Sequence, residues 1–438
     1  MSDQDAGSAA AAAPSFGPVT PRERIVTLDI LRGIALLGVV IANVWLWFSG
    51  AWFNFPAVLD ELRVLSLDSV VFHGIGLFVS GKAITTFSFL FGLGFAIQML
   101  RATDRGMAIA PVYRRRLTVL LLFGLTHAVL LWYGDILIIY ALLGFLLLAF
   151  QKRADRTLLV WAGVFIIAIP LALSSVPLIA GLVGGEGPGG GPGAEGGPMA
   201  ELRATALAAF QSGRPSDVVA ANLRMLGFFF LSPKILGMLS TLGVFLLGLY
   251  AGRKGFFVNT VEHREGFRRV ARWGLAVGFV FSAALVTVWV RVPFEAMGEN
   301  PYLPLLTTVF YVLGTFPLAF GYIAAVTLLV ERPAWRRVLG TFAPVGRMAL
   351  TNYLSQTVLC LLVFYGYGGG LVGEVSPAPA FLIALLVFGA QMLWSPWWLA
   401  RFRFGPAEWL WRSLTYRRLQ PMRVAGPAPV AVEPKITG

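Results

Sequence analysis

The sequence is poor in cysteine, histidine and charged residues. Of its 438 residues one is cysteine and three are histidine, and only 13% are charged, against about 25% in a typical soluble protein. The single Cys360 lies in an apolar run, which excludes an intrachain disulfide framework and a cysteine-rich metal site. No acidic cluster has metal-ligand spacing, and no Gly-x-Ser-x-Gly motif is present. We therefore expect Cys360 to be a core residue, and we expect neither a bound metal nor a bound cofactor.

Hydrophobic residues are abundant instead, at 57% of the chain. They gather in long runs separated by short polar loops, which is typical of a polytopic membrane protein. The sequence predicts an all-α fold, an integral membrane bundle of about ten transmembrane helices. The expected spans are approximately 26–48, 83–100, 117–133, 135–151, 158–183, 234–252, 270–291, 303–330, 346–368 and 379–400.

The distribution of lysine and arginine sets the expected orientation. Of the 35 basic residues, 26 lie before the first span, in every second loop or in the tail. Since cytoplasmic loops are enriched in Lys and Arg, both termini are predicted to be cytoplasmic. The net charge of +13 then follows from membrane orientation. We expect a multi-pass protein of the cell (inner, cytoplasmic) membrane whose partner is the lipid bilayer, with no nucleic acid bound; a homo-oligomer is compatible with the sequence.

The chain divides into two halves around a flexible linker. Residues 1–23 form an Ala-, Ser-, Gly- and Pro-rich tail, which we expect to be disordered. Residues 24–183 are a five-span half, 184–233 a Gly/Pro-rich linker and a surface helix, 234–416 a second five-span half, and 417–438 a cytoplasmic tail. The loop 49–82 is expected to hold a re-entrant or interfacial helix.

The first span carries three polar residues. Asp29 and Arg32 are three residues apart, so they lie on one helix face and can pair. Asn43 follows eleven residues later, about 16 Å deeper and near the middle of a ~30 Å hydrocarbon core. These groups are either an interfacial anchor pair with a packing amide, or the floor of a polar site inside the bundle.

This first span resembles that of the YeiB-like bacterial membrane proteins (domain of unknown function 418). The resemblance continues in the block His127-x5-Tyr-Gly-Asp135 and in residues 344–357, 391–394 and 405–412. The first span is also similar to the start of the transmembrane acetyltransferases of the heparan-α-glucosaminide N-acetyltransferase type. The wider membrane acyltransferase group has Arg, ten residues and then His. Asn43 stands at that place here, so a catalytic histidine is not carried over to it.

The histidines differ in their surroundings. His263 lies in an Arg-rich loop and is expected to be solvated. His127 lies about 16 Å from Arg116 along its span, close to the depth of Asn43; it is either a packing residue or a general base. His73 falls in the loop region where the heparan-type enzymes carry their active-site histidine, although its neighbours do not match their motif.

Other polar residues have a structural and a functional interpretation. Lys82 is either a snorkelling anchor or a donor-binding group, and Asp135 is either a helix N-cap or part of a site. In the second half Arg347, Thr351 and Ser355 step by four along one helix face, which either joins helices or lines a cavity.

Two functions of different class fit these features. The first is an acyltransferase, acetyl in the simplest case, that uses acyl-CoA (acetyl-CoA) as co-substrate and passes the acyl group to an unidentified acceptor; the second is a small-solute transporter or export factor. A scaffold for envelope assembly is a third. Candidate catalytic residues are His127, His73 and Asn43. Candidate donor- or substrate-binding residues are Asp29, Arg32, Lys82, Asp135, Tyr140, Arg347, Thr351, Asn352 and Gln356. Similar depths predict that Asn43, His127 and Gln356 line one cavity, with Arg32 and Arg347 nearer the cytoplasm.

Overall fold

The protein is all-α, as predicted. The computed structural model describes residues 25–424 apart from 105, 107, 183–197, 294, 295 and 297–299. Within these residues the chain is helical, with one isolated bridge between Phe402 and Arg423 and no longer strand pairing. The predicted N-terminal tail and nearly all of the 184–198 linker lie outside the described residues.

The first half of the chain begins with a helix that changes its winding at Asn43. α1 (Val26–Asn43) continues as the π-helical turn η2 (Val44–Phe48). The helices that follow are α2 (Phe55–Glu61), α3 (Leu67–Phe78), α4 (Lys82–Asp104), α5 (Ala110–Leu130), α6 (Leu137–Leu148), α7 (Asp155–Gly163), η3 (Val164–Ala168), α8 (Ile169–Ser174) and α9 (Val176–Leu182). The expected helix in the loop 49–82 is therefore confirmed as α3.

The second half follows a pair of surface helices, α10 (Pro198–Gln211) and α11 (Pro215–Leu231). The remaining helices are η4 (Pro233–Met238), α12 (Leu239–Arg253), α13 (Arg264–Arg291), α15 (Tyr302–Val330), α16 (Pro333–Leu339), η5 (Gly340–Phe342), α17 (Ala343–Arg347), α18 (Ala349–Phe364), α19 (Pro377–Leu399) and α20 (Pro406–Tyr416). Cys360 of α18 is fully buried, as predicted.

Seven helical segments of the described chain are long and apolar enough to cross a membrane. They are Val26–Phe48, Leu67–Asp104, Asp155–Leu182, Ile235–Arg253, Arg264–Arg291, Tyr302–Val330 and Pro377–Leu399. Leu137–Leu148 and Ala349–Phe364 are apolar but shorter. The multi-pass architecture is confirmed in this coarser form, whereas the predicted number of ten is not.

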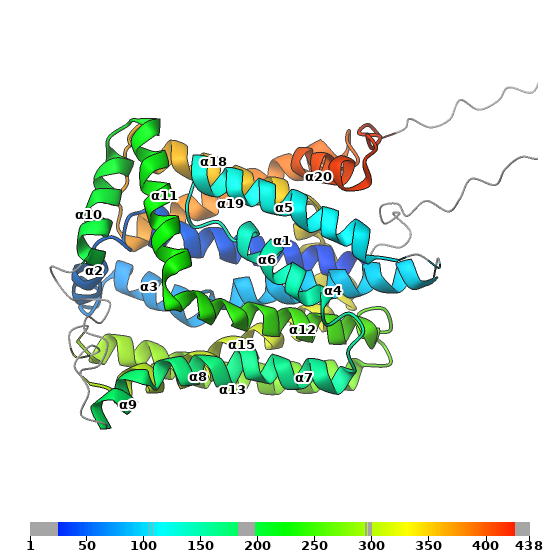
Figure 1. The fold of residues 1–438 in the computed structure, drawn as a ribbon, viewed down its shortest axis with the longest axis horizontal. Coiled ribbons are helices and arrows are strands. Elements are labelled where there is room, and N and C mark those ends of the chain that lie inside the picture. The colour runs from blue at the N-terminus through cyan, green and yellow to red at the C-terminus, as the bar shows by residue number, and fades with distance from the viewer. Residues whose placement is uncertain are drawn as a thin grey trace, which may run out of the picture.

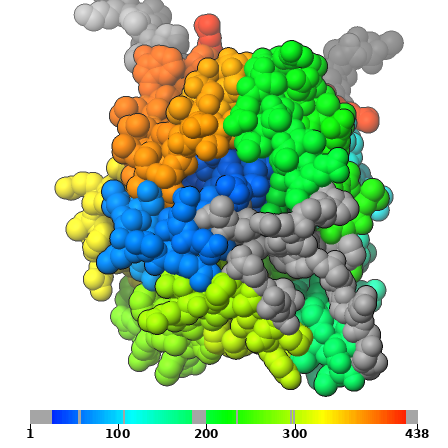
Figure 2. All heavy atoms as spheres, turned by 90° about the vertical axis from the view of Figure 1, so that its left-hand side faces the viewer, coloured from blue at the N-terminus to red at the C-terminus, as the bar shows by residue number. Residues whose placement is uncertain are grey.

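The long helices run roughly parallel, and the chain starts and ends at the same end of the bundle (Figure 1). We call this the α20 end. α10 and α11 lie across the opposite end, which we call the hairpin end. Figure 2 views the hairpin end, where the green α10–α11 pair and the orange segments surround the recessed end of the first helix.

Glycines let helices of the two halves approach closely. A Cβ atom on Gly92 of α4 would clash with the backbone of Phe245 in α12, and one on Gly248 would clash with that of Phe89. Gly346 of α17 lies in the same way against the backbone of Asp29. Small residues at such crossings are the usual basis of helix packing in membranes. The first and second halves therefore form one packed bundle.

One long segment is broken inside the bundle. α3 ends at Phe78 and α4 begins at Lys82, and Gly81 between them has φ +77. Gly81 lies against Tyr311 and Thr315, near the middle of the 29-residue helix α15. The break therefore falls well inside the bundle, with Lys82 at the start of its second part.

Candidate functional site

A cavity of about 280 Å³ opens near the α20 end. Its wall is formed by residues of α1, α4, α5, α6, α17, α18 and α20, which are far apart in the sequence. We call it the arginine cavity, because five arginines line it against two carboxylates. These residues are Arg32, Arg101, Arg116, Arg347 and Arg412, with Asp29 and Glu408. Its size is close to the lower end of the ~300–1,000 Å³ range of ligand pockets.

Two of the arginines are held in place by neighbours. The Arg32 guanidinium donates to the Asp29 carboxylate at 2.9 Å, which confirms the predicted pair. The Arg116 guanidinium lies 3.9 Å from the centre of the Trp411 ring, and the Trp411 indole N–H donates to the Arg116 carbonyl at 2.9 Å. A guanidinium fixed by stacking or pairing keeps further N–H donors for an anion. The cationic excess of the cavity favours a ligand with several negative charges.

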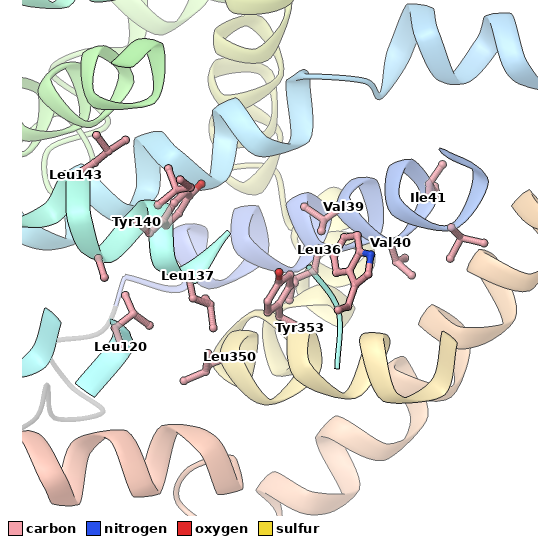
Figure 3. Close-up of a cluster of buried hydrophobic side chains, with 14 of the residues drawn as sticks. Leu36, Val39, Val40, Ile41, Leu120, Leu137, Tyr140, Leu143, Leu350 and Tyr353 are labelled. Atoms are coloured by element: carbon pink, nitrogen blue, oxygen red, sulfur yellow. The ribbon is translucent and has the colours of Figure 1, made fainter. Parts of the chain in front are cut away.

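Away from the arginines the cavity becomes apolar. Leu36 and Val39 of α1 and Leu350 of α18 line this part, with Tyr140 and Tyr353 at its margin. Figure 3 shows these side chains within a cluster of buried hydrophobic residues, on α1, α6 and α18. Tyr140 donates or accepts a hydrogen bond with Ser88 at 2.7 Å, and the Tyr353 hydroxyl accepts the Ile136 N–H at 3.2 Å. The cavity thus has a cationic mouth and an apolar inner part.

Glu408, which lines the cavity, fixes α20 to the bundle. Its carboxylate accepts the backbone N–H groups of Leu350 (2.6 Å) and Thr351 (3.1 Å), and the Thr351 hydroxyl (2.5 Å). It therefore caps the first turn of α18 from another helix. Burial raises the pKa of the Glu408 carboxyl, while its hydrogen bonds with Thr351 and Leu350 act in the opposite direction. Thr351, which was predicted to bind the acyl donor, hydrogen-bonds to Glu408 here.

His127 belongs to a second polar group, which we call the His127 relay. His127 Nδ1 lies 2.8 Å from Asp135 Oδ2, and His127 Nε2 lies 2.9 Å from Thr357 Oγ1. The other Asp135 oxygen accepts the Ile138 N–H at 2.8 Å at the start of α6, as expected of a residue that caps this helix. His127 and Asp135 are almost fully buried, with side chains 1% and 0% exposed. Sequence reasoning found two members and missed their partner Thr357, one turn beyond Tyr353.

The amides of α18 join helices. Gln356 Nε2 donates to Gln391 Oε1 at 2.9 Å, and Gln391 Nε2 donates to the Asn352 carbonyl at 2.8 Å. Asn352 also donates to Ser395 and accepts from Trp394 of α19. The stripe that was expected either to join helices or to line a cavity does both. Ser355 accepts a hydrogen bond from Gln391 of α19 and Thr351 donates to Glu408 of α20, whereas Arg347 lines the arginine cavity.

The expected meeting of Asn43, His127 and Gln356 needs correction. None of the three lines the arginine cavity. Asn43 is half-buried at the last residue of α1, His127 bonds to Asp135 and Thr357, and Gln356 bonds to Gln391. Equal depth did not bring His127 and Gln356 together, because His127 bonds to Thr357 of α18 whereas Gln356, one residue earlier, bonds to Gln391 of α19.

Lys82 and His73 lie apart from the arginine cavity. Lys82 is 3% exposed and donates to the Gly76 carbonyl at 2.9 Å, so the predicted snorkelling position is wrong. His73 is half-buried in α3, with Nδ1 3.3 Å from the Ser69 hydroxyl. Both flank the α3–α4 break, and neither is among the residues that line the arginine cavity.

Comparison with known proteins identifies the family. "Uncharacterized protein YxaH" of Bacillus subtilis (strain 168) is 34% identical over 434 residues, covering 93% of this chain and 98% of the relative. The family described as "Protein of unknown function (DUF418)" matches residues 251–418. The chain belongs to the DUF418 family. "Uncharacterized protein YeiB" of Escherichia coli (strain K12) is 28% identical over 425 residues, covering 93% of this chain and 98% of the relative.

The DUF418 match includes much of the site. Residues 251–418 contain α17, α18 and α20, and with them Arg347, Tyr353, Thr357, Glu408 and Arg412. The remaining members of the arginine cavity and of the His127 relay come from the part of the chain before this match. Both parts are covered by the alignment with YxaH, which extends over nearly the whole chain.

Proposed function

We propose that this protein is a membrane acyltransferase, acetyl in the simplest case, that takes its acyl group from cytoplasmic acyl-CoA. The observation that carries the proposal is the arginine cavity, with its cationic mouth and apolar inner part. Coenzyme A carries several phosphate charges at one end and a long, slender arm that ends in the thioester. Arginine is well suited to phosphate because it offers paired N–H donors.

The proposed orientation places the α20 end in the cytoplasm. Ten membrane crossings, both termini in the cytoplasm and the bacterial inner membrane complete this topology. It is supported by the basic residues at the α20 end, where Arg101, Arg116 and Arg412 line the cavity mouth. In this orientation a cytoplasmic donor reaches the cavity without crossing the bilayer. The acceptor then comes from the envelope side, the hairpin end.

Chemistry in this proposal belongs to the His127 relay. Tyr353 lines the inner part of the cavity, and its ring centre lies 5.3 Å from that of His127. A thioester that enters past the arginines therefore ends one side chain away from the relay. With Asp135 on one side, the imidazole is oriented to take a proton at Nε2, as a general base requires.

The test is acyl transfer by the purified protein in lipid nanodiscs. With labelled acetyl-CoA we expect saturable binding and release of free CoA in the presence of an envelope extract as acceptor source. Arg347→Gln should weaken acetyl-CoA binding about tenfold, the loss of roughly one charge-assisted contact. Arg268→Gln is the matched control, because Arg268 is exposed on α13 beside Glu265 and does not line the cavity. Unsaturable binding, or equal effects of the two changes, would contradict the proposal.

Transport of a small anionic solute is the second candidate, favoured by the break between α3 and α4. Helices interrupted inside the membrane are typical of transporter binding sites. Lys82 is buried at the break and bonded to the Gly76 carbonyl, which is where a transporter of this kind would bind an anionic solute. Counterflow of a labelled anion in proteoliposomes without CoA release would favour transport over transfer.

A further inference from the structure

The hydrogen bonds of the His127 relay define where its proton lies. Asp135 Oδ1 already accepts the Ile138 N–H, and a carboxylate can only accept. With Asp135 as a carboxylate, His127 Nδ1 carries a hydrogen and donates it to Asp135 Oδ2. In the neutral imidazole Nε2 then carries no hydrogen and accepts the Thr357 hydroxyl at 2.9 Å. The order carboxylate, imidazole, hydroxyl is that of an activated nucleophile.

Thr357, like Thr351, directs its hydroxyl to another helix, unlike two other buried threonines of the bundle. The hydroxyls of Thr86 and Thr327 donate to the carbonyl four residues earlier in their own helices, Lys82 and Ile323. Thr357 is equally buried, at 2% exposed, yet the hydrogen bond of its hydroxyl goes to His127 on another helix, 230 residues away in sequence. Helix formation alone does not call for this arrangement.

The relay lies between the two ends of the bundle. Thr357 follows Tyr353 by one turn of α18, about 6 Å along the helix away from the cavity. On its other side the His127 ring lies 6.4 Å from that of Trp132, which packs against Phe48 toward the hairpin end. A group bound to Thr357 would thus lie between the donor cavity and the hairpin end.

We infer that Thr357 is the nucleophile that carries the acyl group, as an ester, between donor and acceptor; this rests on the proposed acyltransferase function. Thr357 Oγ1 attacks the thioester carbon while its proton moves to His127 Nε2. The C–S bond breaks, and the CoA thiolate takes that proton and leaves as a thiol. An acceptor hydroxyl or amine then gives its proton to Nε2 and attacks the ester carbon. The bond to Thr357 breaks, and the proton returns to Oγ1.

Burial serves this carrier role. An acyl ester surrounded by a relay that is 2% exposed or less at His127 and Thr357 is shielded from hydrolysis. The donor thioester and the acceptor never need to occupy one cavity together, since each reacts with Thr357 in turn. The geometry therefore accounts for transfer across a bundle in which the relay itself is closed.

The experiment is trapping of the acyl-enzyme without acceptor. Full-length protein in nanodiscs is incubated with labelled acetyl-CoA, quenched and digested, and the peptide that contains Thr357 is analysed by mass spectrometry. We expect acetylated Thr357, released by hydroxylamine. Thr357→Val should lose the label and lower transfer by about 10³-fold. Thr357→Ser should retain the label, which shows that the helix tolerates change there.

Controls separate the possible failures. Thr327→Val removes an equally buried hydroxyl on α15 and should leave labelling unchanged. Acetyl-CoA binding by Thr357→Val reports that its cavity is intact. If the wild type transfers acetyl but Thr357→Val does so equally, or the label sits on another residue, Thr357 is not the carrier while the proposed function stands. If the wild type neither binds acetyl-CoA nor releases CoA, both fall.

Discussion

The arginine cavity and the His127 relay lie on either side of Tyr353 but differ in how far their charged and polar side chains are exposed. The Arg32 side chain in the cavity is 29% exposed and is paired with Asp29, whereas the His127 and Asp135 side chains are 1% and 0% exposed. Charges near water bind other charges at modest cost, while buried groups must satisfy one another. In the proposed function the first region binds the donor and the second carries out the reaction, so changes in each should have separable effects.

The largest expected effect comes from His127→Ala, which removes the base and leaves the cavity lining unchanged. We expect kcat for acetyl transfer to fall by about 10³-fold, since no other group of the relay takes the proton. The affinity for acetyl-CoA, measured by calorimetry, should stay as in the wild type. His263→Ala is the matched control, as His263 lies beside Phe256 in a loop away from both regions. Retained turnover would remove His127 from the mechanism and direct attention to His73.

Glu408→Ala should affect binding through stability. The change leaves the Leu350 and Thr351 N–H groups without their acceptor, at a cost of about 2–3 kcal/mol in unfolding free energy. The thermal midpoint in detergent should fall, and acetyl-CoA affinity with it, because α20 closes the cavity. Glu265→Ala, which removes an exposed carboxylate beside Arg268, should change neither. A stable Glu408→Ala protein that binds acetyl-CoA normally would show that α20 is not needed for the cavity.

Salt should distinguish the two regions with a smaller effect. Raising ionic strength from about 0.05 M to about 0.5 M shortens the Debye length several-fold and weakens attraction between the arginines and CoA phosphates. KM for acetyl-CoA should rise several-fold, whereas kcat at saturation should not change because the relay is sealed from ions. A fall in kcat of the same size as the rise in KM would mean that the two regions are not separate.

Gln356→Leu should have the smallest effect. Gln356 bonds to Gln391, and its own Oε1 has no partner among the described residues. A leucine therefore removes one hydrogen bond but also removes a buried acceptor without a partner, and the two effects partly offset each other. We expect a change of at most about 1 kcal/mol in unfolding free energy, with kcat and KM unchanged. A large loss of turnover without loss of stability would return Gln356 to the site.

Local pattern predicted much of this structure. Hydrophobic runs located the helices, and spacing predicted the Asp29–Arg32 pair, since both depend on residues near in sequence. Counting along spans gave the depth of Asn43, His127 and Gln356 but not the direction that each faces. That direction depends on which helices are neighbours, and packing of α18 against α19 turned Gln356 away from His127.

The missed residues have a common cause. The sequence indicates only the orientation of Arg101, Arg116 and Arg412, because loop composition shows on which side of the membrane a residue lies and not which cavity it lines. Thr357 carried a weak signal, its position four residues after Tyr353 on one helix face. Its link with His127 joins residues 230 apart, a distance that no local pattern covers.

The position of α20 has a consequence for how the protein is made. Glu408, Trp411 and Arg412 lie in the last helix of the described chain, yet they form part of the wall of a cavity that is also lined by the first helix. During synthesis α1 leaves the ribosome well before α20, so this part of the cavity wall forms only after nearly all of the described chain has been made. If the cavity binds acyl-CoA as proposed, a nascent or truncated chain without α20 lacks a finished donor site, and the donor can bind only once α20 has been released and docked.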